Sequence, residues 1–319
     1  PDYFIRKQTL TNAERYTTDK LKDLENIILG AEDKLNSLEY EVFVEIRDEI
    51  AKNVNRIQSS AKAIAYIDAI CSLATVAYNN NYVKPEINTT GIIDIKDGRH
   101  PVVETMLSDD SFIANDTYLD QNKKRMSIIT GPNMAGKSTY MRQTALICMM
   151  AQIGSFVPAK QANLCVCDRI FTRVGASDDL ASGQSTFMVE MTEVANILRN
   201  ATRNSLVILD EIGRGTSTFD GLAIAWAVVE HISNIKLIGA KTLFATHYHE
   251  LTDLENKFSH IVNYRIEVDE KQGKVMFLRN IVKGGADKSY GIEVAKLAGL
   301  PKEILVESRK ILKRLEQKK

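Results

Sequence analysis

The chain has 319 residues, 44% of them hydrophobic, which is enough for about two domains and a sizeable core. Its 41 basic side chains balance 41 acidic ones, so net charge gives no basic footprint for nucleic acid, although a local patch is compatible with it. No apolar stretch reaches the roughly 18 residues that a membrane span requires, and no signal peptide opens the chain. We therefore expect a cytoplasmic protein without membrane contact. Because it begins at Pro1, we also expect a fragment.

Residues 17–78 predict long helices, because this stretch has no proline and only one glycine, Gly30. Apolar residues recur three and four positions apart, as in a heptad seam. The seam residues are Leu21, Leu24, Ile28, Ala31, Leu35, Leu38 and Val42, followed less strictly by Ile46, Ile50, Val54, Ile57, Ala61 and Ile64. An unbroken helix would span about 90 Å. We expect two long helices packed against each other, ending in a linker at residues 79–85.

Beyond the linker, short apolar runs alternate with helical segments, which predicts an α/β domain with a mainly parallel sheet. The expected strands are 92–95, 126–130, 162–167, 169–174, 205–209, 241–246, 260–268 and 274–280, the last two forming a hairpin around Gly273. The expected helices are 138–153, 186–202 and 219–233. From Tyr290 to the end, the pattern predicts a helix, a turn and a second helix that begins near Pro301. That pair can pack on its own domain or on another subunit.

The run from Thr130 to Thr139 matches the phosphate-binding P-loop pattern Gly-x-x-x-x-Gly-Lys-[Ser/Thr] and lies between an expected strand and an expected helix. Main-chain amides at the start of that helix form an anion site. Lys137 is expected to reach the β- and γ-phosphates of ATP, and Ser138 to supply a hydroxyl to Mg²⁺. The expected nucleotide-binding residues are Gly131, Pro132, Asn133, Met134, Ala135, Gly136, Lys137, Ser138 and Thr139.

A second acidic motif follows the expected strand 205–209. Asp210 is placed to hold Mg²⁺ through its water shell, because phosphoryl transfer needs a carboxylate near the metal. Glu211 is placed to orient or deprotonate the attacking water. These two motifs together predict an ATP hydrolase.

Longer segments carry a more specific resemblance. They are 173–191, the run Asp210–Gly221 (DEIGRGTSTFDG), Thr242–Tyr248 (TLFATHY), Arg99–Pro101, Phe112–Asn115 and Asp287–Gly291. With the P-loop they resemble the ATPase domain of the MutS family of bacterial DNA mismatch-repair proteins, and the likeness runs over nearly the whole chain. Residues 3–16 resemble the point where such proteins leave the DNA clamp and re-enter the helical core.

The resemblance implies an ABC-like ATPase that binds two nucleotides between two head-to-tail subunits. The loop 181–185 is similar to the ABC signature, so Ser185 is expected to reach the partner's γ-phosphate in trans. His247 matches the histidine that senses the γ-phosphate, and Phe112 matches the aromatic that stacks on adenine. Arg214 and Asp220 lie in the loop after Glu211. They either couple the two sites or form a solvated turn.

The resemblance also implies partners and boundaries. We expect a helical core and lever segment at 1–84, a P-loop ATPase domain at 85–282 and a C-terminal helix-turn-helix at 283–319. The homodimer would form through the ATPase faces and these C-terminal helices. In the full-length protein, the implied partners are mismatched duplex DNA and MutL. The mismatch-binding, connector and clamp domains have no room in this chain.

Two other classes remain as alternatives. A recombination-suppressing MutS paralogue would bind branched DNA, but such paralogues carry a different P-loop neighbourhood and usually a nuclease tail. An SMC-like structural ATPase would place the P-loop before its coiled coil, whereas here the motif follows the helices.

Overall fold

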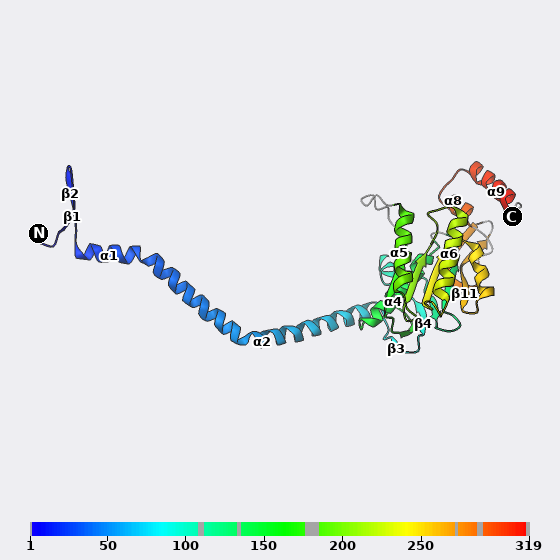
Figure 1. The fold of residues 1–319 in the computed structure, drawn as a ribbon, viewed down its shortest axis with the longest axis horizontal. Coiled ribbons are helices and arrows are strands. Elements are labelled where there is room, and N and C mark those ends of the chain that lie inside the picture. The colour runs from blue at the N-terminus through cyan, green and yellow to red at the C-terminus, as the bar shows by residue number, and fades with distance from the viewer. Residues whose placement is uncertain are drawn as a thin grey trace. The chain divides into compact units, whose positions relative to one another are not determined.

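A computed structural model describes residues 2–107, 112–132, 135–175, 185–271, 274–285 and 290–316. The chain divides into two compact units, Pro1–Cys71 and Ser72–Lys319, and each is described by itself. The boundaries expected near residues 84 and 282 stay predictions. Figure 1 traces the elements of both units from the N-terminus to the C-terminus.

The first unit begins with an antiparallel pair of strands, β1 (Ile5–Leu10) and β2 (Ala13–Thr17). Helix α1 (Asp19–Leu29) follows, and the Thr18 hydroxyl caps it by accepting a hydrogen bond from the Leu21 amide at 3.1 Å. After Gly30 the chain continues as α2 (Ala31–Asn79), a helix of 49 residues that extends beyond the first unit. The helical prediction for this stretch is confirmed.

The expectation of two long helices packed against each other is wrong. The chain forms one short helix and one very long one, and the apolar seam is exposed, with Leu35 and Leu38 at 56% and 59% exposure. A heptad pattern specifies an apolar stripe without specifying what covers it.

Over one 18-residue window, α2 also reaches a mean hydropathy of 1.3, so by length and composition it is apolar enough to cross a membrane. This differs from the expectation that no stretch is long and apolar enough, although charged residues such as Lys62 and Asp68 do interrupt the apolar residues of α2. Periodic seam residues raise the mean without forming an uninterrupted stretch. A long core helix of a soluble protein passes the same test.

The second unit contains a six-stranded sheet with the order β12-β11-β6-β10-β9-β8. All neighbouring pairs are parallel except β11 with β12. The bounds are β6 Met126–Thr130, β8 Ile170–Arg173, β9 Leu206–Asp210, β10 Lys241–Thr246, β11 Ile261–Lys271 and β12 Lys274–Lys283. The predicted α/β class and mainly parallel sheet are therefore confirmed. The antiparallel pairing of β11 with β12 also confirms the expected hairpin, while Gly273 lies outside the described residues.

A second sheet of four strands has the order β3-β7-β4-β5. Its strands are β3 Glu86–Asn88, β4 Ile93–Gly98, β5 Asn115–Leu119 and β7 Gln161–Cys165. Strands β4 and β7 were expected from the sequence, although not as part of a separate sheet, whereas β3 and β5 were not expected. Strand periodicity marks a strand but does not identify its neighbours.

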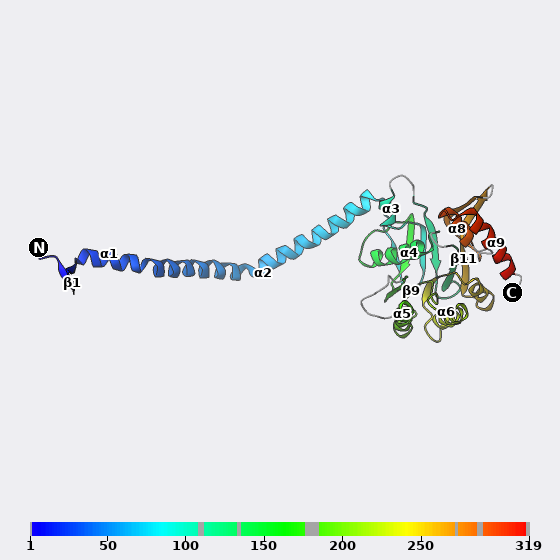
Figure 2. The ribbon, with the colours of Figure 1, turned by 90° about the horizontal axis from the view of Figure 1, so that it is seen from above.

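Helices cover both faces of the main sheet, as Figure 2 shows for α4, α5 and α6. The longer helices are α4 Lys137–Gln152, α5 Thr186–Asn200 and α6 Thr218–Ser233. Alternate residues of β9 enter opposite cores: Leu206 and Ile208 pack with α4 and the small sheet, whereas Val207 and Leu209 pack with α5 and α6. The five residues of β9 are thus buried on both sides, which explains their continuous apolar run.

The remaining elements are short, except for the last. They are α3 Val103–Met106, η1 His249–Asp253, α7 Leu254–Lys257, α8 Gly291–Leu297 and α9 Lys302–Glu316. Helices α8 and α9 occupy the positions of the two expected C-terminal helices, and α9 begins just after Pro301. Arg309 of α9 forms an ion pair with Glu293 of α8 at 2.6 Å.

Candidate functional site

The loop between β6 and α4 lies at the carboxyl end of a central strand. Gly131 has φ 144° and Gly136 has φ 106°, conformations that favour glycine. A Cβ atom at Gly131 would also lie 3.1 Å from the Ile266 side chain. Helix α4 begins at Lys137, one residue before the expected start. Asn133 and Met134 lie outside the described residues.

Lys137 is 4% exposed, and its ammonium folds back onto the loop that precedes it. Nζ donates to the Gly131 carbonyl at 2.7 Å and to the Pro132 carbonyl at 3.0 Å. Burial lowers the pKa of Lys137, and the nearby carboxylates of Glu211 and Asp210 oppose that shift. The buried ammonium of Lys137 therefore contacts the main chain of the loop between β6 and α4.

Ser138 and Asp210 come together across adjacent elements. The Ser138 hydroxyl donates to Asp210 Oδ2 at 2.6 Å. Asp210 ends β9 and is 8% exposed, and its Oδ1 is buried without a hydrogen-bond partner among the described residues. Burial is the largest cause of the raised pKa of Asp210, which the Ser138 hydrogen bond partly offsets. The pair therefore offers one engaged and one available carboxylate oxygen.

Glu211 lies beside His247 because β9 and β10 are parallel neighbours, with Asp210 opposite Ala245. The Glu211 amide donates to the Ala245 carbonyl at 2.9 Å, and Glu211 itself has φ 55°. Its carboxylate contacts His247 Nε2 at 2.5 Å and pairs with Arg214 through the other oxygen. The His247 hydrogen bond, supported by Arg214, lowers the pKa of Glu211 to about 2.

The Glu211–His247 pair faces a cavity of about 540 Å³. Gly131 and Pro132 line it, as do Tyr290 and Val294. The sequence analysis did not single out Tyr248, which also lines this cavity. Its hydroxyl donates to the Gly213 carbonyl at 3.0 Å.

A second cavity, of about 210 Å³, lies beside the first turn of α4. Phe112 lines it together with Gly136 and Thr139, so the structure brings the expected aromatic next to the loop. Arg279 also lines it, and the sequence analysis missed this residue. Arg279 has φ 59°, and the buried Asn115 side chain donates to its carbonyl at 3.0 Å. No sequence motif marks Arg279, because its position depends on an irregularity in the β11–β12 pairing.

Ser185 is not brought together with the other predicted site residues. It is exposed at the start of α5 and accepts a hydrogen bond from the Met188 amide at 3.2 Å. Residues 181–184 of the same expected loop lie outside the described residues. Asp220 lies in the first turn of α6 and accepts a hydrogen bond from Ser217 at 2.8 Å, whereas Arg214 contacts Glu211.

The fold and the residues at the strand ends first indicate a class of protein. An α/β domain on a largely parallel sheet, with a lysine, a serine and an aspartate at the carboxyl ends of its strands, is consistent with an ATPase domain. Residues 127–316 match the family model for MutS domain V, and residues 1–34 match the model for MutS family domain IV. The chain belongs to the MutS family.

Relatives over nearly the whole chain agree with that assignment. It is 70% identical to the DNA mismatch repair protein MutS of Lachnoclostridium phytofermentans over 317 residues, which is 99% of this chain and 34% of that protein. The proteins of the same name from Acetivibrio thermocellus and Clostridium tetani are 61% and 62% identical over 316 residues, covering 99% of this chain and 36% of each. The chain thus spans about a third of the length of these relatives.

Proposed function

We propose that this chain is the ATPase and dimerisation part of a MutS protein, and that it binds and hydrolyses ATP to switch a DNA clamp. One observation supports this most directly. Lys137, Ser138 and Asp210 converge at the carboxyl ends of two parallel strands, with the hydroxyl and the carboxylate 2.6 Å apart. A P-loop ATPase requires these three groups together.

The residues fit a triphosphate and its metal. The amides of the loop from Gly131 to Thr139 would surround the phosphates, and Lys137 would exchange its two loop carbonyls for phosphate oxygens. Mg²⁺, when bound, would supply positive charge that offsets the negative charge of the phosphates. Ser138 and Asp210 would hold it, because oxygen donors suit this ion and Asp210 Oδ1 is buried without a partner among the described residues. The described residues include no cluster of three or more His, Cys, Asp or Glu side chains that could hold a metal.

Glu211 would act as the base toward the attacking water, and His247 would respond to the γ-phosphate. A carboxylate with a pKa of about 2, engaged by both His247 and Arg214, is a poor proton acceptor. It must therefore exchange one of these partners for water before it can accept a proton. The adenine would enter the cavity between Phe112 and Arg279.

The exposed position of Ser185 supports a composite site. An exposed hydroxyl at the start of α5 is suited to the partner subunit's γ-phosphate. The homodimer would form through the ATPase faces and through α8 and α9. In the full-length protein the partners would be mismatched duplex DNA and MutL, in the cytoplasm. The relatives are DNA mismatch repair proteins by name, which supports this assignment.

Equilibrium binding of labelled Mg·ATP, in the absence of turnover, tests the proposal. Wild type should retain nucleotide at millimolar concentration or below. Lys137→Met should weaken retention, because it removes the ammonium but keeps the apolar stem. Lys160→Met, at an exposed lysine away from the site, is the matched control. Failure of the wild type to retain nucleotide would refute the proposed function.

A further inference from the structure

Three charged residues form a cluster beneath the loop that carries Glu211. Arg173 at the end of β8 is 4% exposed, and Glu190 on α5 is 6% exposed. The guanidinium of Arg173 lies 2.9 Å from the Glu193 carboxylate and 3.5 Å from Glu190, and it donates to the Val174 carbonyl at 3.0 Å. Burying a charged side chain costs free energy of folding unless the charge has a close partner. The burial of Glu190 therefore requires such a partner.

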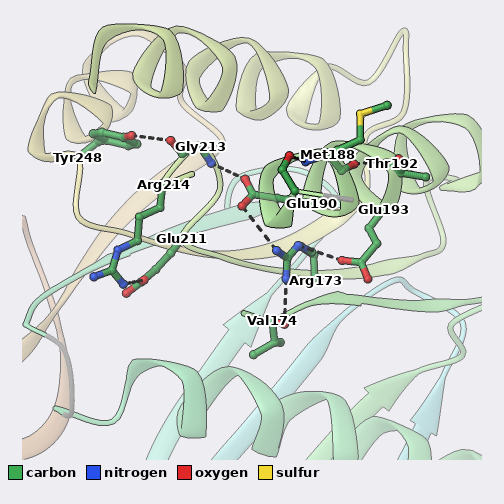
Figure 3. Close-up of polar contacts among 11 residues, drawn as sticks. Arg173, Val174, Met188, Glu190, Thr192, Glu193, Glu211, Gly213, Arg214 and Tyr248 are labelled. Atoms are coloured by element: carbon green, nitrogen blue, oxygen red, sulfur yellow. Dashed lines mark hydrogen bonds and ion pairs between the residues drawn. The ribbon is translucent and has the colours of Figure 1, made fainter. Parts of the chain in front are cut away.

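The close partner of Glu190 is a main-chain amide two residues beyond Glu211. Gly213 donates its N–H to Glu190 Oε1 at 2.6 Å, much shorter than the contact between Glu190 and Arg173. Figure 3 shows this carboxylate between the guanidinium and the loop. A carboxylate that accepts from an amide forms one of the stronger protein hydrogen bonds. The principal partner of Glu190 is therefore the loop that carries Glu211.

Both main-chain polar groups of Gly213 form hydrogen bonds with side chains. Its amide is fixed by Glu190 of α5, and its carbonyl accepts from Tyr248, which follows His247. The loop that carries Glu211 thus lies between α5 on one side and the segment after β10 on the other.

We propose that Glu190 is a positioning residue that makes the placement of Glu211 depend on the placement of α5. This inference rests on the proposed ATPase function and deepens it. Ser185 caps the same helix five residues earlier, and it is the group proposed to reach the partner's nucleotide. A helix of 15 residues moves as a rigid element, so a displacement at Ser185 displaces Glu190. The Gly213 amide follows, and Glu211 with it. Contact between Ser185 and the partner's nucleotide thereby changes the position of Glu211 in this chain's own site.

Two substitutions separate this role from a purely structural ion pair. Glu190→Gln keeps the length and an acceptor oxygen for Gly213 but removes the charge that faces Arg173. Glu190→Asp keeps the charge but withdraws the carboxylate by about 1.5 Å, one carbon–carbon bond. The proposal predicts that the aspartate variant is the more damaging. A role that depends only on the negative charge facing Arg173 predicts the reverse order. Glu193→Gln is the matched control on the same helix, because Glu193 contacts Arg173, whereas among the described residues the Gly213 amide is held by Glu190.

The measurements are ATP turnover, nucleotide affinity and hydrogen exchange of the peptide that contains Gly213. Glu190→Asp should lower kcat about 10²-fold, the order of effect of a misplacement near 1 Å, with an unchanged Kd for nucleotide. Glu190→Gln should stay within about tenfold of wild type, since a neutral acceptor weakens the hydrogen bond without abolishing it. Exchange at the Gly213 peptide should accelerate in the aspartate variant alone.

Several outcomes would overturn the inference. They are a glutamine variant slower than the aspartate variant, equal losses in the Glu193 control, or unchanged exchange at Gly213. If wild type neither retains nor hydrolyses nucleotide, the proposed function fails, while the exchange order still reports on the contact between Glu190 and Gly213. If wild type hydrolyses ATP and Glu190→Asp does so at the same rate, only the positioning role fails.

Discussion

Glu211 is the residue on which the proposed chemistry depends most. Replacing it with glutamine keeps the volume and removes the proton acceptor. We expect Glu211→Gln to bind Mg·ATP as wild type does and to slow hydrolysis by about 10²- to 10⁴-fold. Single-turnover kinetics beside equilibrium binding measure both quantities. Unchanged turnover would show that another group activates the water.

The low pKa of Glu211 also predicts a pH dependence of stability. Its pKa is about 2 in the folded chain against an ordinary 4.5, so the ionised form stabilises the fold. That contribution is complete above about pH 4.5 and is lost as the pH falls toward 2. The difference in free energy of unfolding between wild type and Glu211→Gln should therefore be constant at higher pH and shrink below about 4.5. Urea unfolding between about pH 5.5 and pH 3 measures it. Parallel curves across this range would contradict the assignment.

At the scale of elements, the loop after β9 packs unusually close to α6. Gly213 has φ 89°, and a Cβ atom there would lie 2.4 Å from the Gly221 carbonyl oxygen. Gly154 also has φ 89°, but nothing lies within 4 Å of its Cβ position. Gly154→Ala is therefore a matched control that carries the backbone strain of about 1–2 kcal/mol and no clash.

We expect Gly213→Ala to be less stable than Gly154→Ala by about 1–3 kcal/mol, because overpacking adds to the same backbone strain. Chemical denaturation of the two variants measures the difference. Equal destabilisation would mean that the loop moves away from α6 at no cost.

The sequence predicts best the elements whose own residues show how they are buried. Strands β6 and β10 have the expected bounds because both faces of each are buried, which requires a continuous apolar run. The small sheet was not separated from the large one, because β3 and β5 are short and their pairing depends on partners distant in sequence. The covering of the α2 seam was predicted wrongly for a related reason, since periodicity does not specify a partner.

The same distinction holds within the candidate site. The convergence of Lys137, Ser138 and Asp210 follows from motifs at strand ends, so the sequence could place it. Arg279 lies outside every motif, and Glu190 lies within the segment 173–191 but has no role implied by its pattern. Their roles arise from contacts between segments 23 and 164 residues apart, Glu190 with Gly213 and Asn115 with Arg279.

At the scale of the whole molecule, the exposed Ser185 predicts that one active site needs two chains. A Lys137→Met chain lacks its own phosphate contact, and a Ser185→Ala chain lacks the contact it would give to a partner. Mixing the two should restore one intact site in each heterodimer and recover up to about a quarter of wild-type turnover, half of the sites in the half of dimers that are mixed. Steady-state ATP hydrolysis across mixing ratios measures this.

The unmixed variants are the controls, and sedimentation with a slowly hydrolysed ATP analogue should show that the mixture forms dimers. Dimers without any recovery of activity would mean that each chain completes its own site.

The close approach of Gly213 and Gly221 has one more consequence. No side-chain atom separates the two backbones, so there is no soft layer to absorb a shift of a few tenths of an ångström. When the segment bearing Glu211 moves toward α6, this contact displaces the first turn of α6. Thr218 in that turn forms part of the wall of the larger cavity. The chamber in which water would attack therefore changes its dimensions when its acidic residue moves in that direction.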